Sequence, residues 1–184
     1  HLLVDRMGRW EAFRQIHFPS NQAKYKQALS RLIFEELFIA QIRLNLIKID
    51  RHKNSKGQVF EKVGDYFNTF YNNYLPFELT GAQKRVIKEI RVDVAKGFQM
   101  NRLLQGDVGS GKTMIALMAM LIAADNGFQS CLMAPTEILA QQHYSSLTDL
   151  LKAMPVEVAI LTGSTKAAER RRILKGLADD TIHF

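Results

Sequence analysis

The sequence is poor in cysteine and in long hydrophobic runs. Its single cysteine, Cys131, cannot form an intrachain disulfide, and because it lies in an apolar stretch we expect an inert, buried thiol. No apolar run approaches the roughly 20 residues that a membrane-spanning helix needs. The first residues also lack the features of a secretion signal. These absences predict a cytoplasmic protein that is not embedded in a membrane.

Acidic residues are fewer than basic ones, and an initiating methionine is missing. The 184 residues contain 25 Lys and Arg against 18 Asp and Glu, and residues 1–75 hold most of the excess, with 12 basic and 7 acidic residues. This surplus fits a polyanionic partner such as nucleic acid, but it fits a solvated linker equally well. Because the chain also stops inside an expected strand at Phe184, we expect a fragment of a longer protein.

Residues 106–113 match the phosphate-binding pattern G-x-x-x-x-G-K-[ST] at each fixed position. Glycine permits positive φ angles and lets backbone N–H groups approach phosphate oxygens, and a following helix adds its unpaired N–H groups. In this pattern Lys112 reaches the β and γ phosphates and Thr113 holds Mg²⁺, so these two are the predicted catalytic residues. The predicted nucleotide-binding residues of the loop are Gly106, Asp107, Val108, Gly109, Ser110, Gly111, Lys112 and Thr113.

The flanking sequence favours a phosphate loop over a glycine-rich turn with a surface lysine. Apolar runs that read as strands alternate with helical patterns, and this alternation predicts a parallel sheet covered by helices on both faces. The expected strands are residues 102–105, 129–134, 156–161 and 181–184, and the expected helices are residues 114–124, 138–152 and 166–177. Ligands of such sheets bind beyond the carboxyl ends of the strands, where residues 106–113, 134–137 and 162–164 form loops.

Three further helix starts carry polar side chains that helix capping explains, and two of them also suit contact with a nucleic acid. Thr80 and Gln83 have the spacing of a capping box, which is sufficient reason for Gln83 to be there. Thr136 with Glu137, and residues 162–165, offer hydroxyls and N–H groups that suit a nucleic-acid phosphate. Ordinary helix capping accounts for them as well.

The N-terminal part is expected to be helical. The pattern predicts a short helix over residues 8–17, and a long amphipathic helix with Ser20 as its N-cap. A polar loop over residues 51–58 and an aromatic helical segment over residues 60–74 follow. We place a domain boundary at about residue 75, between a helical connector and a nucleotide-binding domain.

Several of these segments resemble the RecG family, the bacterial ATP-dependent DNA helicases of superfamily 2 that remodel branched DNA. The segments are residues 16–19, 34–38, 75–83, 100–113, 133–143 and 161–164. The resemblance implies that residues 1–75 connect a wedge domain to the motor and that residues 76–184 are the truncated first RecA-like motor domain, a P-loop NTPase fold. It also implies ATP and Mg²⁺ as cofactors, branched double-stranded DNA as partner, and a role in DNA repair and recombination in the bacterial cytoplasm. No obligate protein partner is implied.

By the same resemblance, Gln83 recognises adenine. Five residues of the neighbouring loops face the DNA backbone, namely Pro135, Thr136, Glu137, Thr162 and Gly163. The acidic pair that holds Mg²⁺ in this family does not follow the phosphate loop at the right place, because Asp179 and Asp180 precede an expected strand. We therefore expect that pair beyond Phe184, and negligible ATP hydrolysis by this chain alone. Transcription-repair coupling factors of the Mfd type have a similar motor and remain an alternative, as does a non-enzymatic nucleotide-binding module.

Overall fold

The computed structural model describes residues 7–184, without the side chains of His52 and Lys53. The prediction about a secretion signal therefore lies outside the described residues. Contacts divide the chain into two units, His1–Ser55 and Lys56–Phe184, so residues 56–75 pack with the second unit, although the predicted boundary lies at about residue 75. The roles assigned to residues 1–75 and 76–184 stay predictions. Within residues 7–184, no helix combines the length and hydrophobicity needed to cross a membrane.

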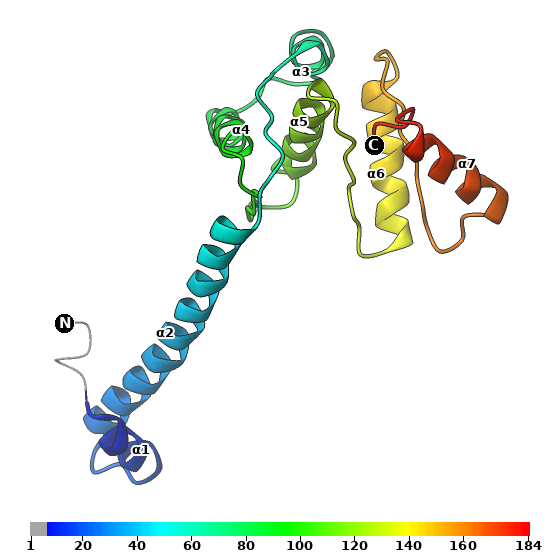
Figure 1. Cartoon of the computed structure of the whole chain (residues 1–184). Coiled ribbons are helices and arrows are strands. Elements are labelled where there is room, and N and C mark those ends of the chain that lie inside the picture. The colour runs from blue at the N-terminus through cyan, green and yellow to red at the C-terminus, as the bar shows by residue number, and fades with distance from the viewer. Residues whose placement is uncertain (1–6) are drawn as a thin grey trace. The chain divides into compact units, whose positions relative to one another are not determined.

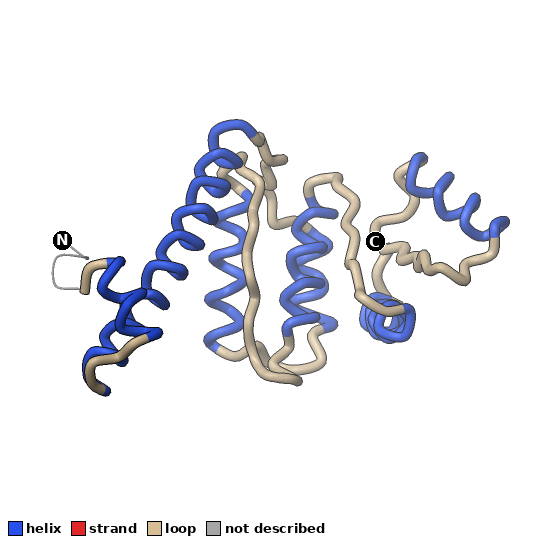
Figure 2. Tube along the Cα trace, turned by 90° about the horizontal axis from the view of Figure 1, so that it is seen from below, coloured by secondary structure: helices blue, strands red, loops and turns tan. Residues whose placement is uncertain are grey.

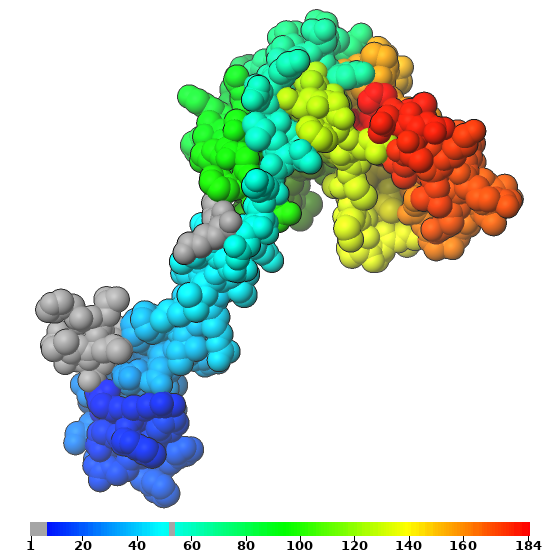
Figure 3. Space-filling view, viewed as in Figure 1, coloured from blue at the N-terminus to red at the C-terminus, as the bar shows by residue number. Residues whose placement is uncertain are grey.

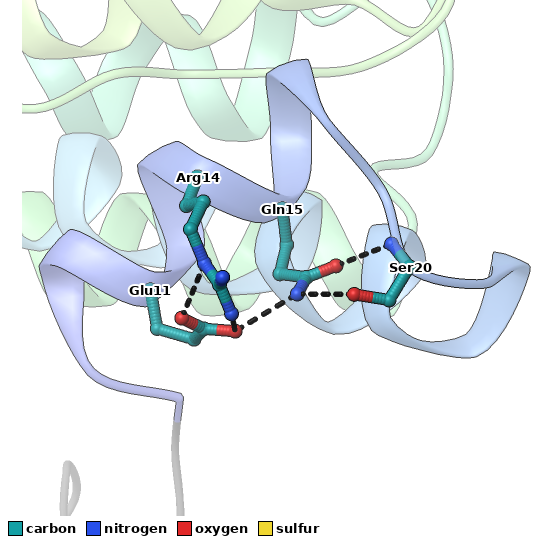
Figure 4. A network of polar contacts seen from close by, with 4 residues as sticks. All are labelled: Glu11, Arg14, Gln15 and Ser20. Atoms are coloured by element: carbon teal, nitrogen blue, oxygen red, sulfur yellow. Dashed lines mark hydrogen bonds and ion pairs between the residues drawn. The ribbon is translucent and has the colours of Figure 1, made fainter.

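The first unit consists of α1 (Arg9–His17) and α2 (Gln22–Asn54), joined by a short turn (Figure 1). The buried side chain of Gln15 organises this turn (Figure 4). Its Nε2 donates to a Glu11 carboxylate oxygen (2.8 Å) and to Ser20 Oγ (2.9 Å), and its Oε1 accepts from the Ser20 backbone N–H (2.8 Å). The prediction that Ser20 is the N-cap of α2 is therefore wrong. Asn21 takes that position, and its Oδ1 accepts from the Lys24 backbone N–H at 2.9 Å.

α2 is longer and more exposed than the sequence predicts. It continues to Asn54, so part of the loop expected at residues 51–58 is helical. Its apolar residues point to several sides, and many are exposed within the described chain, including Leu37 (61%) and Leu44 (59%). In Figure 3, α2 is coloured blue to cyan, and on the face in view α1 lies only against its N-terminal end. The predicted apolar face is therefore not buried within the first unit.

The second unit is built around α5 (Lys112–Asp125). This helix is apolar on all sides, and most of its residues are buried. α3 and α4 pack against it (Figure 1). The helices of this unit are α3 (Asp65–Thr69), the π-helix η1 (Phe70–Tyr74), α4 (Gly81–Val94), α5, α6 (Glu137–Leu151) and α7 (Ala167–Ala178). The predicted helices therefore occur, within two residues at each end for α5, α6 and α7.

The aromatic segment becomes helical only from Asp65 onward, so Phe60 and Val63 precede the helix. Asp125, the last residue of α5, holds this segment in place. Its carboxylate accepts backbone N–H groups from Gly64 (2.8 Å), Tyr66 (2.8 Å) and Phe67 (3.1 Å). The carboxylate thereby satisfies amides at the start of α3, which would otherwise lack partners.

Residues 7–184 contain helices and loops but no regular strand (Figure 2). Three of the four predicted strands are nevertheless linked by backbone hydrogen bonds. The N–H of Ser130 donates to the carbonyl of His183 (2.9 Å), the N–H of His183 to Glu157 (2.9 Å), and the N–H of Ala159 to Phe184 (2.8 Å). These bonds are too few for a regular ladder, so the sheet stays a prediction. Cys131 lies in one of these segments. We expected it to be buried, but it is exposed.

Candidate nucleotide site and neighbouring loops

The predicted phosphate loop leads directly into α5. Gly109 and Gly111 have φ angles of +80°, which few other residues adopt, so two of the three glycines serve the backbone conformation expected of them. Gly106 does not take a positive φ. Its lack of a side chain has another reason, because a Cβ there would lie 2.7 Å from Ser110 Oγ. Gly106 therefore packs closely against Ser110 of the same loop.

The start of α5 is suited to an anion. Gly111 is the N-cap and supplies no side-chain acceptor, so the helix begins without a side-chain cap. The first-turn N–H groups and the positive end of the helix dipole are then available to phosphate oxygens. Met114 and Ile115 are buried immediately behind, which anchors this turn in the core. The residues present thus fit a nucleotide phosphate.

Lys112 lies at the first turn of α5 and folds back over the loop. Its Nζ donates hydrogen bonds to the carbonyls of Gly106 (2.8 Å) and Asp107 (2.7 Å). The positive charge of Lys112 is therefore held against the backbone of the loop. Two backbone carbonyls are weaker partners for an ammonium group than an anion, so a phosphate could displace them.

Gln83 connects α4 to the phosphate loop. Its Oε1 accepts the backbone N–H of Thr80 (2.8 Å), and Thr80 Oγ1 accepts the backbone N–H of Gln83 (3.3 Å), so the predicted capping box is present. Its Nε2 also donates to the carbonyl of Ser110 (3.0 Å). The amide oxygen is thus bonded to Thr80 and the amide nitrogen to Ser110, and these two bonds hold Gln83 beside the loop.

Sequence reasoning missed the residue that fixes the entry to the loop. Arg102 donates from Nε to Asp93 (2.6 Å) and from Nη1 to Glu89 (2.7 Å), and both acids lie on α4. Lys96 also donates to Asp93, at 3.0 Å. Hydrogen bonds from Lys96 and Arg102 hold the pKa of Asp93 below its ordinary value. An arginine just before a phosphate loop, with two acids on the preceding helix, was a signal that could have been followed.

The two loops predicted to face DNA lie against each other. Thr136 is the N-cap of α6, and its Oγ1 accepts the backbone N–H of Leu139 (3.3 Å), which confirms the capping interpretation. The hydroxyl of Ser164 donates to the Glu137 carboxylate, joining the start of α6 to residues 162–165. Among residues 7–184, no hydrogen bond or ion pair joins either loop to the phosphate loop.

A cavity of about 320 Å³ lies beside this junction. Its lining includes Glu137, Thr162, Ser164 and Lys166. No cluster of three or more His, Cys, Asp or Glu side chains that could hold a metal ion occurs in the described part of the chain.

The chain is similar to several known proteins. Residues 80–183 match the DEAD/DEAH box helicase family. The ATP-dependent DNA helicase RecG of Streptococcus pneumoniae is 47% identical over 176 residues, which make up 94% of this chain and 25% of that protein. RecG of Thermotoga maritima is 40% identical over 176 residues, covering 96% of this chain and 22% of that protein.

A solved structure of RecG bound to a three-way DNA junction is also similar, with a TM-score of 0.78 and 40% identity over 95% of this chain and 24% of that chain. The chain therefore spans about a quarter of the length of these relatives. The resemblance to RecG predicted from the sequence is confirmed, and these relatives do not favour the transcription-repair coupling factor.

Proposed function

The chain belongs to the DEAD/DEAH box helicase family, and on this premise we propose that it is part of an ATP-dependent helicase acting on branched double-stranded DNA. Membership of this family implies the use of ATP. The similarity to RecG supports the rest of the proposal, because the related solved structure holds a three-way DNA junction. Remodelling of such junctions would place the protein in DNA repair and recombination, in the bacterial cytoplasm.

The observation that carries the proposal is the geometry of residues 106–113. Two left-handed glycines, an uncapped helix start and the ammonium group of Lys112 come together in this one loop. We assign the N–H groups of this loop to the phosphates of ATP, Lys112 to the β and γ phosphates, and the Thr113 hydroxyl to Mg²⁺. Hydrolysis of the bound ATP supplies the free energy for movement along DNA.

Gln83 is assigned to the adenine base. A glutamine side chain can pair with adenine through both its amide oxygen and its amide nitrogen. Both groups are already engaged, with Thr80 and with Ser110. Each group can make one more hydrogen bond, because the amide nitrogen carries two N–H groups and the amide oxygen has two lone pairs, so Gln83 can pair with adenine while it stays bonded to Thr80 and Ser110.

The remaining site residues are assigned to DNA. Pro135, Thr136, Glu137, Thr162 and Gly163 lie on the two joined loops, and a Cβ at Gly163 would meet no atom within 4 Å, so the backbone there is open to a phosphate. We further assign the linked segments at residues 129–134, 156–161 and 181–184, with residues 102–105, to a parallel RecA-like sheet covered by helices on both faces.

Calorimetric titration of the protein with ATP and Mg²⁺ tests the nucleotide site. We expect saturable, Mg²⁺-dependent binding that Lys112→Ala weakens at least about tenfold, since a charged hydrogen-bonding partner of the phosphates is lost. Lys152→Ala, which removes an exposed lysine at the end of α6, is the matched control and should bind like the unsubstituted protein. Equal ATP affinity in Lys112→Ala, or no binding at all, would contradict the proposal.

A further inference from the structure

Glu137 and Ser164 form the junction between the two DNA-facing loops. The Ser164 hydroxyl donates to Glu137 Oε1, and Ser164 Oγ lies 3.1 Å from Thr162 Oγ1. Thr162 Oγ1 lies 3.3 Å from Thr165 Oγ1, which also accepts the Thr162 backbone N–H at 2.8 Å. Four side chains from two loops are thus connected by hydrogen bonds.

The carboxylate gives this chain of hydroxyls a direction. An ionised carboxylate only accepts hydrogen bonds, so the Ser164 hydroxyl must point its proton toward Glu137. Ser164 Oγ is then free to accept from Thr162, and Thr162 Oγ1 to accept from Thr165. On the opposite side, Arg170 of α7 donates to the Thr162 carbonyl at 3.1 Å. Residues 162–165 are therefore held from α6 and from α7.

The same chemistry argues against a direct bond between Glu137 and DNA. Phosphate oxygens and carboxylate oxygens are both acceptors and both negative, so they cannot share a hydrogen bond and they repel each other. A carboxylate at a phosphate-binding surface therefore weakens binding unless it serves another purpose. The bond to Ser164 supplies that purpose.

We propose that Glu137 is a positioning residue that does not itself contact DNA, and that it holds residues 162–165 in the arrangement that binds the DNA backbone. This inference rests on the proposed function, because it assumes that the two loops face DNA. It revises the expectation that Glu137 touches the DNA backbone. Gly163, at the tip of the held segment, keeps its open approach for a phosphate.

The proposal is tested by measuring whether replacement of Glu137 weakens or tightens DNA binding. Fluorescence anisotropy with a labelled three-way junction should show that Glu137→Ala binds about five- to tenfold more weakly, because the hydrogen bond that orders the loop is lost. A carboxylate that only repelled phosphate would give the opposite result, since its removal would tighten binding. Glu137→Gln keeps an acceptor oxygen for Ser164 and should restore affinity to the unsubstituted level or above it.

Two further variants keep the test independent of the stability of Glu137→Ala. Ser164→Ala should weaken DNA binding at least as much, because it removes the same bond and leaves the repelling carboxylate in place, and the double variant should be no weaker than Ser164→Ala. Asp149→Ala removes a negative charge from the exposed side of α6 and is the matched control, for which affinity should not fall. ATP affinity should stay unchanged in all of them, since none of these residues contacts the phosphate loop in the described chain.

Three outcomes would overturn the inference. The first is DNA binding by Glu137→Ala that equals or exceeds that of the unsubstituted protein. The second is failure of Glu137→Gln to recover affinity. The third, no binding of the junction by the unsubstituted protein, would contradict the DNA part of the proposed function itself and is distinguishable from the first two.

Discussion

The side-chain amide of Gln83 donates a hydrogen bond to the backbone carbonyl of Ser110, across 27 residues of sequence and a distance of 3.0 Å. This bond joins the capping box of α4 to the phosphate loop. It also restricts the next residue of the loop, because a Cβ on Gly111 would lie 2.5 Å from Gln83 Nε2. The cap of one helix and the N-cap of another thus form one structural unit, and its parts can be tested separately.

Gly111→Ala should destabilise the protein more than Gly109→Ala. Both glycines have φ angles of +80°, so alanine at either position costs about 1–2 kcal/mol of backbone strain. At Gly109 the added methyl group meets no atom within 4 Å, whereas at Gly111 it displaces Gln83 from Ser110. We expect about 1 kcal/mol of additional loss for Gly111→Ala, measured as the free energy of unfolding in urea.

The control for this difference is the Gln83→Ala background. Without the glutamine side chain, alanine at either glycine should cost the same free energy. A difference that persists in that background would show that some other contact of Gly111 is responsible.

Asp125→Ala should destabilise the second unit by about 2–3 kcal/mol, because it removes the acceptor of three backbone N–H groups at the start of α3. Asp125→Asn should also be less stable than the unsubstituted protein, because its amide NH2 group would replace a carboxylate oxygen and face the backbone N–H donors. Amide hydrogen exchange should rise at Gly64, Tyr66 and Phe67, with urea unfolding giving the total effect.

Asp149→Ala is the control for Asp125, because Asp149 is an exposed aspartate on α6. Its free energy of unfolding should change by no more than about 0.5 kcal/mol. Unchanged exchange at Gly64 and Tyr66 in Asp125→Ala would contradict the role given to this carboxylate.

Acid should weaken the contact between α4 and the entry to the phosphate loop. The pKa of Asp93 is lowered in the folded protein, so its contribution is present above the unfolded value near 3.9 and is lost as the pH falls through the lower folded value. Asp93→Asn should therefore reduce stability at pH 7 by about 0.5–1 kcal/mol, as expected for a partly exposed ion pair. Thermal unfolding at several pH values should show the gap between the two proteins closing toward acid pH.

Arg102→Gln supplies the comparison for this pH effect. This substitution removes one of the two partners that lower the pKa of Asp93. The variant should therefore be less stable at neutral pH, and its stability should change less as the pH falls. A constant difference in stability between Asp93→Asn and the unsubstituted protein across the acid range would show that this contact does not lower the pKa of Asp93.

Much of the candidate site could be predicted because its determinants are local. The spacing of Thr80 and Gln83 defines a capping box, and the helix cap at Thr136 depends on residues within one turn. The left-handed conformation of Gly109 and Gly111 follows from the loop pattern itself. Helix bounds were predictable to within two residues for α5, α6 and α7 for the same reason.

Other features escaped prediction because they depend on contacts between distant segments. Ser20 has the chemistry of an N-cap, but the buried amide of Gln15 engages it, and Asn21 caps α2 instead. Cys131 lies in an apolar stretch and is still exposed, since burial depends on neighbours that the stretch does not contain. The predicted strands share only scattered hydrogen bonds in the described chain, because a strand needs partners along its whole length.

The sequence by itself determined the phosphate loop, the helix that follows it and the order of the neighbouring loops, because these depend on backbone preferences and hydrogen bonds within a few residues. Only the tertiary structure decided what Gln83 and Glu137 do. Each reaches a partner 27 residues away, and such a contact exists only once the intervening helices have packed. Residue type limits which bonds a side chain can make, and the path of the folded chain selects one of them.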